Sequence, residues 1–507
     1  MAESDKFGGA RCNERLAAAG GRVRRVIFHI RAASLFSIIA MLFNSIFLSF
    51  ISLAIVANAQ VSVFDAPARG FQFKAAITHN WGQYAPFFVA PSAPSDYDSS
   101  ATLPGCSITF AQVLQRHGAR YPTAQTGRKF SNTIHRLQTS RTGSGVLNNY
   151  IKNYKYNLGV EELNDLGRRQ TENSGYYFYQ RYQNLARRNE PFIRYDDKKR
   201  VFDSAELWAK GFHRASITDK GRARPETFPY KAVALPHGHG FNNTLNNKAC
   251  PKFEKSYSKK FEKEVVDTIM AGLIQRINSD FQGAGLTGQD VVNLMGLCTM
   301  ETTANFEKTG QLSPLCNLFT EADWVKYGYL SSVQKWYRYG NGNPLGPTMG
   351  VGWVNELIAR LTRSPVQDQT STNTTLDRNP ETFPLQGKLY ADFSHTDDMI
   401  GIYAALGLFN APASGTTKIP TNKIATPKEL GGFSSSLVSP MGARMYVEKM
   451  ICTGHKEELV RVLINERVMT LSNCGADRMG RCTLSKFILS LDFARNGGRW
   501  DQCFANI

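Results

Sequence analysis

Several familiar signatures are missing from this sequence of 507 residues. No two cysteines have the C-x2-C spacing of structural zinc sites, and no third ligand accompanies the pair His237-Gly238-His239. The glycine-rich stretch 340–344 lacks the lysine and the strand-to-helix context of a P-loop, so it is a turn. Internal repeats are absent as well. We therefore expect no metal, no cofactor and no repeat architecture.

Negative charge is also in short supply. The chain has 42 Asp and Glu residues against 60 Lys and Arg, a formal net charge of +18. No nucleic-acid reader motif and no basic stripe with interleaved aromatic residues accompanies this charge, so we expect no nucleic-acid partner. A small polyanionic substrate fits the charge better. With 42% hydrophobic residues, the chain is globular and long enough for two packed units.

The run from Ala32 to Phe64 has no charged residue, and it follows the arginine-rich residues 1–31. It exceeds the roughly 20 apolar residues that span a bilayer. Near its end stands Ala57-Asn58-Ala59, a small-x-small pattern that signal peptidase cleaves. We expect residues 1–59 to be a cleaved secretion signal. If it stays uncleaved, the protein is type II membrane-anchored by this single segment, with the rest of the chain outside.

Of the nine cysteines, only Cys12 precedes that apolar run. An even number on the exported side predicts four disulfides in an oxidising compartment, without fixing their pairing. The sequons at Asn242 and Asn373 fit glycosylation of a secreted surface. The eight remaining cysteines are Cys106, Cys250, Cys298, Cys316, Cys452, Cys474, Cys482 and Cys503.

The most informative stretch is residues 116–123, Arg-His-Gly-Ala-Arg-Tyr-Pro-Thr, which follows the strand-like run 107–114. Loops at strand ends commonly carry chemistry. Here one imidazole, His117, stands between Arg116 and Arg120, whose permanent charges and paired donors suit a phosphate dianion. His117 can take the phosphoryl group as a phosphohistidine that water then hydrolyses. A basic surface loop around a core histidine is the plainer alternative.

At this stretch the sequence resembles the histidine acid phosphatase family, and within it the fungal phytases, which are myo-inositol hexakisphosphate phosphohydrolases. The likeness runs from Trp81-Gly82-Gln83-Tyr84-Ala85-Pro86-Phe87-Phe88 to the C-terminus. It includes residues 343–348, Asn-Pro-Leu-Gly-Pro-Thr, and 389–395, Leu-Tyr-Ala-Asp-Phe-Ser-His.

The resemblance implies an α/β fold, a large domain with a mixed central sheet as in phosphoglycerate mutase. Residues 60–247 and 351–507 would form this domain, and residues 248–350 a smaller inserted helical domain. Apolar periodicity predicts strands at 192–194 and 389–394. It predicts helices at 161–182, 261–277, 288–295, 321–337, 351–361 and 399–408.

The family's site residues carry over by position. The resemblance implies that Arg116, Arg120, Arg194 and His395 hold the phosphate that His117 attacks, with Thr123 as a hydroxyl donor. Thr123 could instead be a simple turn residue, and Arg194 could instead be an ordinary surface charge. Further residues implied at the substrate site are Gln83, Tyr84, Arg128, Lys129 and Lys335. The implied disulfides are Cys106–Cys452, Cys250–Cys503, Cys298–Cys316 and Cys474–Cys482.

The sequence departs from the family after His395, where an aspartic acid normally protonates the leaving oxygen. Thr396 stands there and cannot serve as that acid, but Asp397 and Asp398 follow. Asp397 is the first candidate, as in the related inositol polyphosphate phosphatases with His-Ala-Glu. Asp398 or a bound water is the second, and a site that binds phosphate without turnover is the third. Both carboxylates also suit a helix N-terminus electrostatically.

We therefore expect a secreted, monomeric phytase that acts on phytate or other phosphomonoesters. A broad-specificity acid phosphatase and a phosphate-binding protein with impaired turnover are the alternatives. The carboxylate at Asp397 favours catalysis, and the basic residues Arg128, Lys129 and Lys335 favour phytate. Asp397→Asn is expected to abolish turnover but to leave binding of phosphate analogues intact.

Overall fold

The computed structural model describes residues 64–89, 104–140, 146–225, 227–410 and 417–505. The expected signal segment 1–59 and Cys12 lie outside these residues. One compact unit comprises Val61–Ile507. Within the described ranges, no helix is both long enough and apolar enough to cross a membrane.

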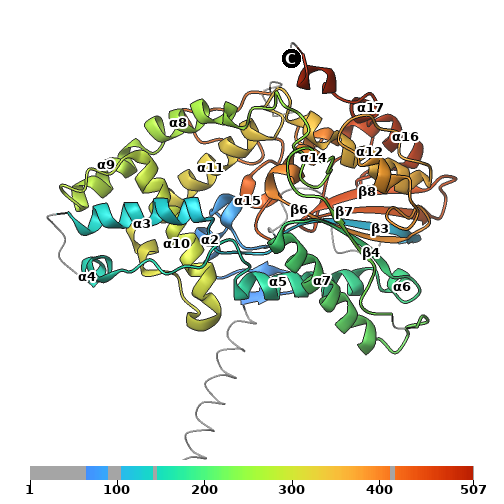
Figure 1. Ribbon diagram of the computed structural model, residues 1–507, viewed down its shortest axis with the longest axis horizontal. Coiled ribbons are helices and arrows are strands. Elements are labelled where there is room, and N and C mark those ends of the chain that lie inside the picture. The colour runs from blue at the N-terminus through green and yellow to red at the C-terminus, as the bar shows by residue number, and fades with distance from the viewer. Residues whose placement is uncertain (1–63, 90–103, 141–145, 226, 411–416, 506–507) are drawn as a thin grey trace, which may run out of the picture. The chain divides into compact units, whose positions relative to one another are not determined.

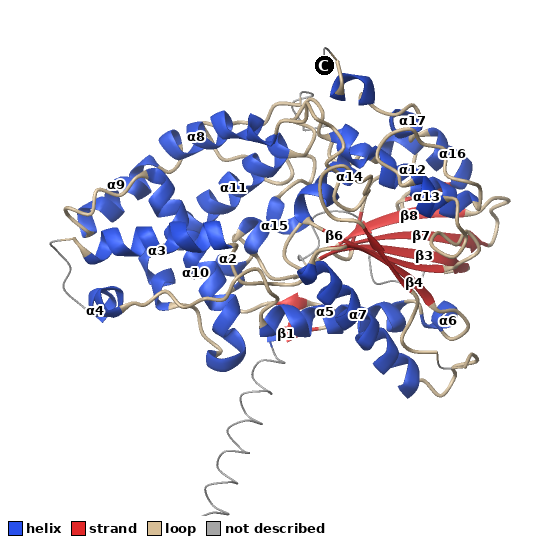
Figure 2. Cartoon of the chain, viewed as in Figure 1, coloured by secondary structure: helices blue, strands red, loops and turns tan. Residues whose placement is uncertain are grey.

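A mixed sheet of eight strands forms the centre of this unit (Figures 1 and 2), as predicted. Its order is β10-β8-β7-β3-β6-β4-β5, with β9 paired to β8. The strands from β3 to β5 in this order are parallel, and those from β3 to β10 are antiparallel. The strands are β3 (Cys106–Arg116), β4 (Pro191–Asp196), β5 (Ala232–Leu235), β6 (Leu389–Ser394), β7 (Arg444–Cys452), β8 (Leu459–Ile464), β9 (Arg467–Val468) and β10 (Arg481–Thr483); β1 (Asp65–Ala66) and β2 (Gly70–Phe71) form a separate pair.

The parallel strands set up the site. Arg116 at the end of β3 pairs with Ser394 at the end of β6, and β4 ends beside them at Asp196. The carboxyl ends of parallel strands meet at one edge of a sheet, where ligands of such sheets bind. Residues that follow β3, β6, β4 and β5 are therefore brought together although they are far apart in the sequence.

Helices cover both faces of the sheet (Figure 2). On one face, Ala111 and Val113 of β3 share a core with Phe178 of α5 and Trp208 of α7. On the other, Phe110 and Leu114 of β3 belong to the main core. The helices in this part are α5 (Asp165–Arg181), α6 (Gln183–Ala186), α7 (Lys199–Thr218), α12 (Val351–Thr362), α13 (Thr374–Asp377), α14 (Thr396–Ala405), α15 (Ser435–Val438), α16 (Leu484–Leu489) and α17 (Asp492–Arg495).

A helical part lies beside the sheet (Figure 1). The predicted helix 261–277 is two helices, and the one predicted at 288–295 extends to Thr309. The long helices α10 and α11 both begin with a capping box, at Thr287 and Thr320. The helices of this part are α2 (Ala75–Thr78), α3 (Ala124–Gln138), α4 (Val146–Asn153), α8 (Lys259–Thr268), α9 (Ala271–Asp280), α10 (Gly288–Thr309) and α11 (Glu321–Arg338).

The helical part draws on more of the chain than residues 248–350. Phe130 of α3 lies in the main core with Leu294 of α10, so α3 belongs with the helical part. That same core also contains Trp353 of α12 and Val462 of β8. Because one core joins both parts, the boundaries at 248 and 350 stay a prediction.

The four disulfides are Cys106–Cys452, Cys250–Cys503, Cys298–Cys316 and Cys474–Cys482, the pairing that the family resemblance implied. The first joins partner positions at the start of β3 and the end of β7. It therefore lies at the opposite end of β3 from Arg116.

Candidate active site

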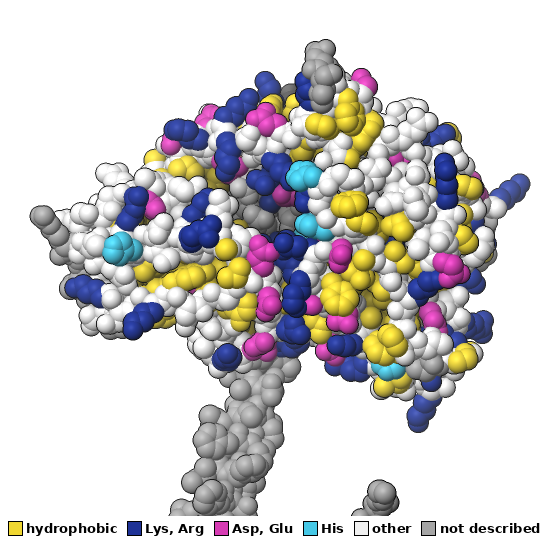
Figure 3. All heavy atoms as spheres, viewed as in Figure 1, with side chains coloured by type: hydrophobic (Ala, Val, Ile, Leu, Met, Phe, Trp, Pro, Cys, Tyr) yellow, Lys and Arg dark blue, Asp and Glu magenta, His cyan; other side chains and the backbone are white. Residues whose placement is uncertain are grey.

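A cleft of about 300 Å³ opens at the carboxyl edge of the parallel strands. In Figure 3, Lys and Arg side chains gather around a hollow near the middle of the visible face. Of the lining residues, seven are Lys or Arg and three are Asp or Glu, which makes the cleft strongly cationic. The lining consists of Gln83, Arg116, His117, Arg120, Glu161, Lys198, Arg200, His237, Asn246, Lys248, Lys255, Lys335, Tyr339, His395, Thr396, Asp397 and Asp398.

His117 follows β3 directly and is buried. Its Nδ1 lies 2.9 Å from the carbonyl oxygen of Gly118, which can only accept, so Nδ1 carries the proton. Nε2 is left with a lone pair. Burial and the nearby charges of Arg200, Arg116 and Arg120 hold the pKa of His117 well below its usual value. The imidazole is therefore neutral, and able to act as a nucleophile, in mild acid.

Gly118 is required by close packing. A Cβ atom here would lie 2.5 Å from the carbonyl oxygen of Gly167 and 2.6 Å from Thr171 Oγ1, both on α5. Only glycine lets the loop after β3 rest on this helix, and that contact fixes the position of the neighbouring His117.

Three guanidinium groups surround the imidazole, that of Arg116 buried and those of Arg120 and Arg200 half-buried. Nη1 of Arg116 donates to the carbonyl oxygens of Gln83 and Ser439, and Nη1 of Arg120 donates to that of Tyr121. The Nε atoms of Arg116, Arg120 and Arg200 are buried, with no hydrogen-bond partner among the described residues. Unpaired buried N–H groups are costly. An anion in the cleft would satisfy them.

Arg200 is the third arginine of the cleft, and the assignment of Arg194 to this role is wrong. Arg194 lies inside β4, where it donates to Glu356 at 2.6 Å and to Asp392 at 2.9 Å. Its guanidinium also stacks over Phe383, and it does not line the cleft. Arg200 stands near the start of α7, beyond the end of the strand. The strand predicted at 192–194 is too short, because β4 extends to Asp196, and the arginine that lies beyond its end is Arg200.

Arg200 connects the nucleophile's surroundings to His395. Its Nη1 donates to Glu161 Oε2 at 3.2 Å, and its Nη2 lies 3.4 Å from His395 Nδ1. Burial and the neighbouring Arg120 lower the pKa of Arg200 to about 10, and burial with Arg120 lowers that of Arg116 to about 9. Both groups remain charged in mild acid, and a bound anion would offset their mutual repulsion.

His395 follows β6 and faces His117, with ring centroids 5.6 Å apart. Its Nε2 donates to Asp196 Oδ2 at 2.7 Å, which directs Nδ1 toward Arg200. The carboxylate of Asp196 is fully buried and also lies 3.0 Å from His237 Nδ1. Burial lowers the pKa of His395 to about 4 although Asp196 acts to raise it. A bound anion would favour the protonated ring.

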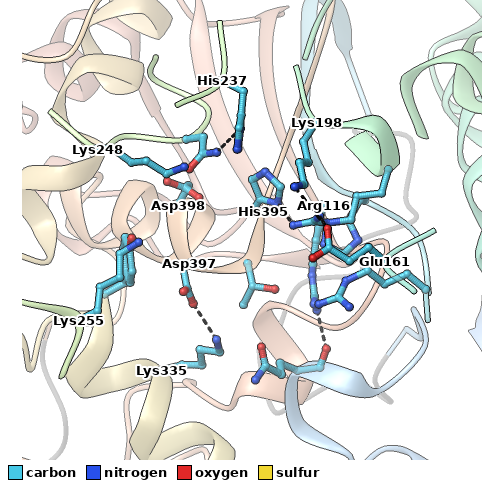
Figure 4. A pocket seen from close by; sticks show the side chains of 17 residues that line it. Arg116, Glu161, Lys198, His237, Lys248, Lys255, Lys335, His395, Asp397 and Asp398 are labelled. Atoms are coloured by element: carbon cyan, nitrogen blue, oxygen red, sulfur yellow. Dashed lines mark hydrogen bonds and ion pairs between the residues drawn. The ribbon is translucent and has the colours of Figure 1, made fainter. Parts of the chain in front are cut away.

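The start of α14 carries the two candidate acids (Figure 4). Asp397 Oδ1 accepts from Lys335 Nζ at 2.7 Å, and its Oδ2 accepts from Arg338 Nε at 3.0 Å. Burial favours the neutral acid, but Lys335 and Arg338 outweigh it and hold the pKa of Asp397 well below its usual range. The hydroxyl of Thr396 is buried without a partner among the described residues.

Asp398 has the opposite character. Its Oδ1 accepts the backbone N–H of Asn247 at 3.0 Å, and no described cation forms an ion pair with it. Burial and the charge of Asp397 raise the pKa of Asp398 to about 8. The two adjacent carboxyls thus differ in charge at mildly acidic pH, Asp397 ionised and Asp398 neutral.

Of the other predicted substrate residues, some line this cleft, some line an adjoining cleft, and some lie outside both. Gln83 and Lys335 line the cleft, and Gln83 also borders an adjoining cleft of about 470 Å³ lined by Tyr84 and Lys129. Thr123 caps α3, accepting from the backbone N–H of Thr126, so its plain alternative as a turn residue fits better. Arg128 is exposed on α3 and lines neither cleft.

Sequence reasoning missed several residues of the cleft. Asp196 and His237 stand at and just after the ends of β4 and β5, the places where a parallel sheet presents its site. His237 had been dismissed as part of a turn-like pair without a metal partner. Other cleft residues belong to no motif and had no sequence signal. Lys255 begins a short 3-10 helix, and the rest lie in loops; they are Glu161, Lys198, Asn246, Lys248 and Tyr339.

A buried histidine with a free Nε2, ringed by arginines at the edge of a mixed sheet, characterises a phosphate-handling site. The model of the "Histidine phosphatase superfamily (branch 2)" matches residues 107–465, and the chain belongs to this superfamily. Its curated relatives include Phytase A of Aspergillus fumigatus, 45% identical over 446 residues, which are 87% of this chain and 94% of that relative. Phytase A of Penicillium oxalicum is 40% identical over 448 residues, 88% of this chain and 95% of that relative.

Solved structures agree on the fold. The phytase from D. castellii is similar with a TM-score of 0.66 at 19% identity, covering 85% of this chain and 88% of that one. The multiple inositol polyphosphate phosphatase of Bifidobacterium longum, in complex with inositol hexasulfate, has a TM-score of 0.53 at 15% identity, covering 82% and 97%. At these identities the likeness concerns the fold alone.

Proposed function

We propose that this protein is a phytase that releases phosphate from myo-inositol hexakisphosphate through a phosphohistidine on His117. The observation that carries the proposal is the set of buried Nε–H groups of Arg116, Arg120 and Arg200, which have no partner in the described part of the chain, around Nε2 of His117. Phosphoryl transfer needs an in-line nucleophile and fixed positive charge on the phosphate oxygens. Relatives named Phytase A along most of the chain support the substrate.

In the first step, Nε2 of His117 attacks phosphorus while the bond from phosphorus to the inositol oxygen breaks. Arg116, Arg120, Arg200 and His395 hold the phosphoryl oxygens. The departing alkoxide takes a proton from a carboxylic acid. In the second step, water attacks phosphorus, the P–N bond breaks, and a proton from that water returns to the carboxylate.

We assign the proton donor to Asp397, with Asp398 as the competing candidate. Both line the cleft. The side chain of Asp397 is 22% exposed, whereas Asp398 is buried. The exposed acid is better placed to meet a leaving oxygen in the cleft. Asp397→Asn and Asp398→Asn separate the two, because only the donor variant should keep hydrolysing an activated aryl phosphate while losing phytate.

Lysines around the cleft favour a substrate with several phosphates. Lys198, Lys248, Lys255 and Lys335 all line it, beyond the three arginines assigned to a single phosphate. A monoester with one phosphate would bring no phosphate to these lysines, of which Lys198 and Lys335 alone have a carboxylate partner among the described residues. Phytate, with its further phosphates, would pair them.

We also propose that the protein is secreted and acts as a monomer. Four disulfides suit an oxidising compartment. The sequon residue Asn242 is exposed, in keeping with a glycosylated surface.

The test is phosphate release by the purified chain from phytate and from myo-inositol monophosphate at pH 5 without added metal. Fast release from phytate and slow release from the monophosphate is the expected result. Equal rates would point to a broad-specificity acid phosphatase. Tight phosphate binding without release from either substrate would mean a phosphate-binding protein.

A further inference from the structure

Asp397 is an unusual proton donor because its carboxylate forms ion pairs with two cations. Lys335 and Arg338 are three residues apart on α11, and each bonds a different oxygen of the same carboxylate. In this arrangement the carboxylate is ionised at the mildly acidic pH where a donor must carry a proton. Either Asp397 does not donate a proton, or its ion pairs with Lys335 and Arg338 become weaker when substrate is bound.

The groups that face Asp397 come from four elements. Besides Lys335 and Arg338 of α11, Lys255 at the start of η2 (Lys255–Ser258) lowers its pKa. Arg116 of β3 interacts with its charge, as does Tyr339 just after α11. The carboxyl of Asp398 on α14 is the acidic neighbour. Cations thus outnumber acids around Asp397, and Lys335 and Lys255 also line the cleft.

We propose that binding of a polyphosphorylated substrate causes protonation of the proton donor, Asp397. The outer phosphates of the substrate pair with Lys335 and Lys255. This pairing weakens the interaction of both lysines with Asp397, so that its carboxylate takes up a proton. This inference rests on the proposed function and adds a reason for substrate choice. A substrate with one phosphate fills only the arginine site around His117. The ion pairs of Asp397 with Lys335 and Arg338 then stay intact, and the Asp397 carboxylate stays unprotonated.

The proton balance is simple. Asp397 takes one proton from solvent when the polyanion binds, because like charges nearby favour the neutral acid. It gives this proton to the inositol oxygen as the P–O bond breaks. The water that cleaves the phosphohistidine returns a proton to it while the outer phosphates remain in place.

The first experiment uses Arg338→Gln, which removes one of the two ion pairs without touching the arginines around His117. The Arg338 side chain is 28% exposed and bonds only Asp397 among the described residues, so the fold should persist. We expect kcat/KM for myo-inositol monophosphate at pH 5 to rise about tenfold, the effect of one pKa unit on the protonated fraction. The phytate-to-monophosphate ratio should fall accordingly.

Two variants control this result. Lys326→Gln lies on the same helix, pairs with Asp323 and does not line the cleft, so the ratio should stay at the wild-type value. In the double variant Arg338→Gln with Asp397→Asn, the gain on the monophosphate should vanish. If Arg338→Gln only raises KM for phytate and gives no gain on the monophosphate, Arg338 is a plain phosphate ligand and the inference is wrong.

A second readout does not need turnover. Myo-inositol hexakissulfate, a polyanion that is not hydrolysed, is titrated into the enzyme at pH 5 by calorimetry in buffers of different ionisation enthalpy. Wild type should take up about one proton more than Asp397→Asn. Equal proton uptake by the two would overturn the inference. Failure of the proposed function looks different, because wild type would then release no phosphate from phytate at all.

Discussion

At the scale of single residues, the cleft solves a problem of acid chemistry: a histidine that attacks phosphorus must stay unprotonated. The Gly118 carbonyl fixes the proton of His117 on Nδ1, and burial among arginines keeps the ring neutral. A lowered pKa means that the nucleophile is available above that pKa and is lost only in stronger acid. Activity should therefore persist well below pH 6.

The assignment of the third arginine of the cleft to Arg200, and not to Arg194, can be tested with one variant at each position. Arg200→Lys keeps a charge but loses the planar fork, so we expect kcat/KM for phytate to drop about 100-fold with little change in thermal stability. Arg194→Met leaves Glu356 buried without an ion-pair partner and Asp392 with Arg360 alone, so it should cost about 3–5 kcal/mol in the free energy of unfolding. Urea denaturation and steady-state kinetics measure the two effects. Strong destabilisation by Arg200→Lys with unchanged kinetics would reverse the assignment.

Asp196 acts through another residue, as a positioning group for His395. Asp196→Asn removes the charge that favours a protonated His395 ring, which must donate Nδ1–H to a bound anion. We expect the inhibition constant of inorganic phosphate at pH 5 to rise about tenfold, which corresponds to the free energy of one charge-assisted hydrogen bond. The weakening should shrink toward lower pH, where the ring protonates without help. A purely structural role would weaken binding equally at every pH.

At the scale of elements, the edge where β3, β6, β4 and β5 end decides which residues meet. The central motif, the strand 389–394 and the histidine after it could be predicted because each has a local pattern. Contacts such as Asp196 with His395, 199 residues apart, could not be, because they depend on strand order. Arg194 was misassigned for the same reason, since its sequence neighbourhood does not tell a residue inside a strand from one beyond its end.

The start of α14 offers a rescue experiment. Thr396 stands where the family resemblance places the acid, and its hydroxyl is buried in the cleft wall with no partner within the described ranges. Adding Thr396→Asp to the inactive Asp397→Asn should restore at least about a hundredfold of the lost phytate turnover, since a positioned general acid contributes that much or more. Thr396→Ser on the same background is the matched control and should restore nothing. Absence of rescue in a folded double variant would show that position 396 no longer reaches the leaving oxygen.

At the scale of the whole molecule, the disulfides hold distant parts of the chain together away from the cleft. Cys106–Cys452 closes a loop of 346 residues at the far end of β3. Replacing both cysteines by alanine should lower the free energy of unfolding by about 2–5 kcal/mol and leave KM for phytate unchanged. Denaturant titration and kinetics at 25 °C check this. A changed KM with unchanged stability would mean that the bridge shapes the site.

Charge on the whole molecule is explained by the cleft only in part. The excess of cations in the sequence favours a small polyanion, but which lysines take part depends on tertiary structure. Lys255 lies on a short 3-10 helix and Lys335 on a long α-helix, yet both line the cleft. Of the two neighbours on α3, Lys129 lines the adjoining cleft and Arg128 lines neither of the two clefts.

The most direct test of the central claim is to trap the phosphoenzyme. Wild type mixed with 32P-labelled phytate at pH 5 and quenched in alkali within milliseconds should carry label on a histidine of the peptide that contains His117. His117→Ala, folded by circular dichroism, should carry none and release no phosphate. Phosphate release from phytate by His117→Ala, or label on another residue in wild type, would contradict the account.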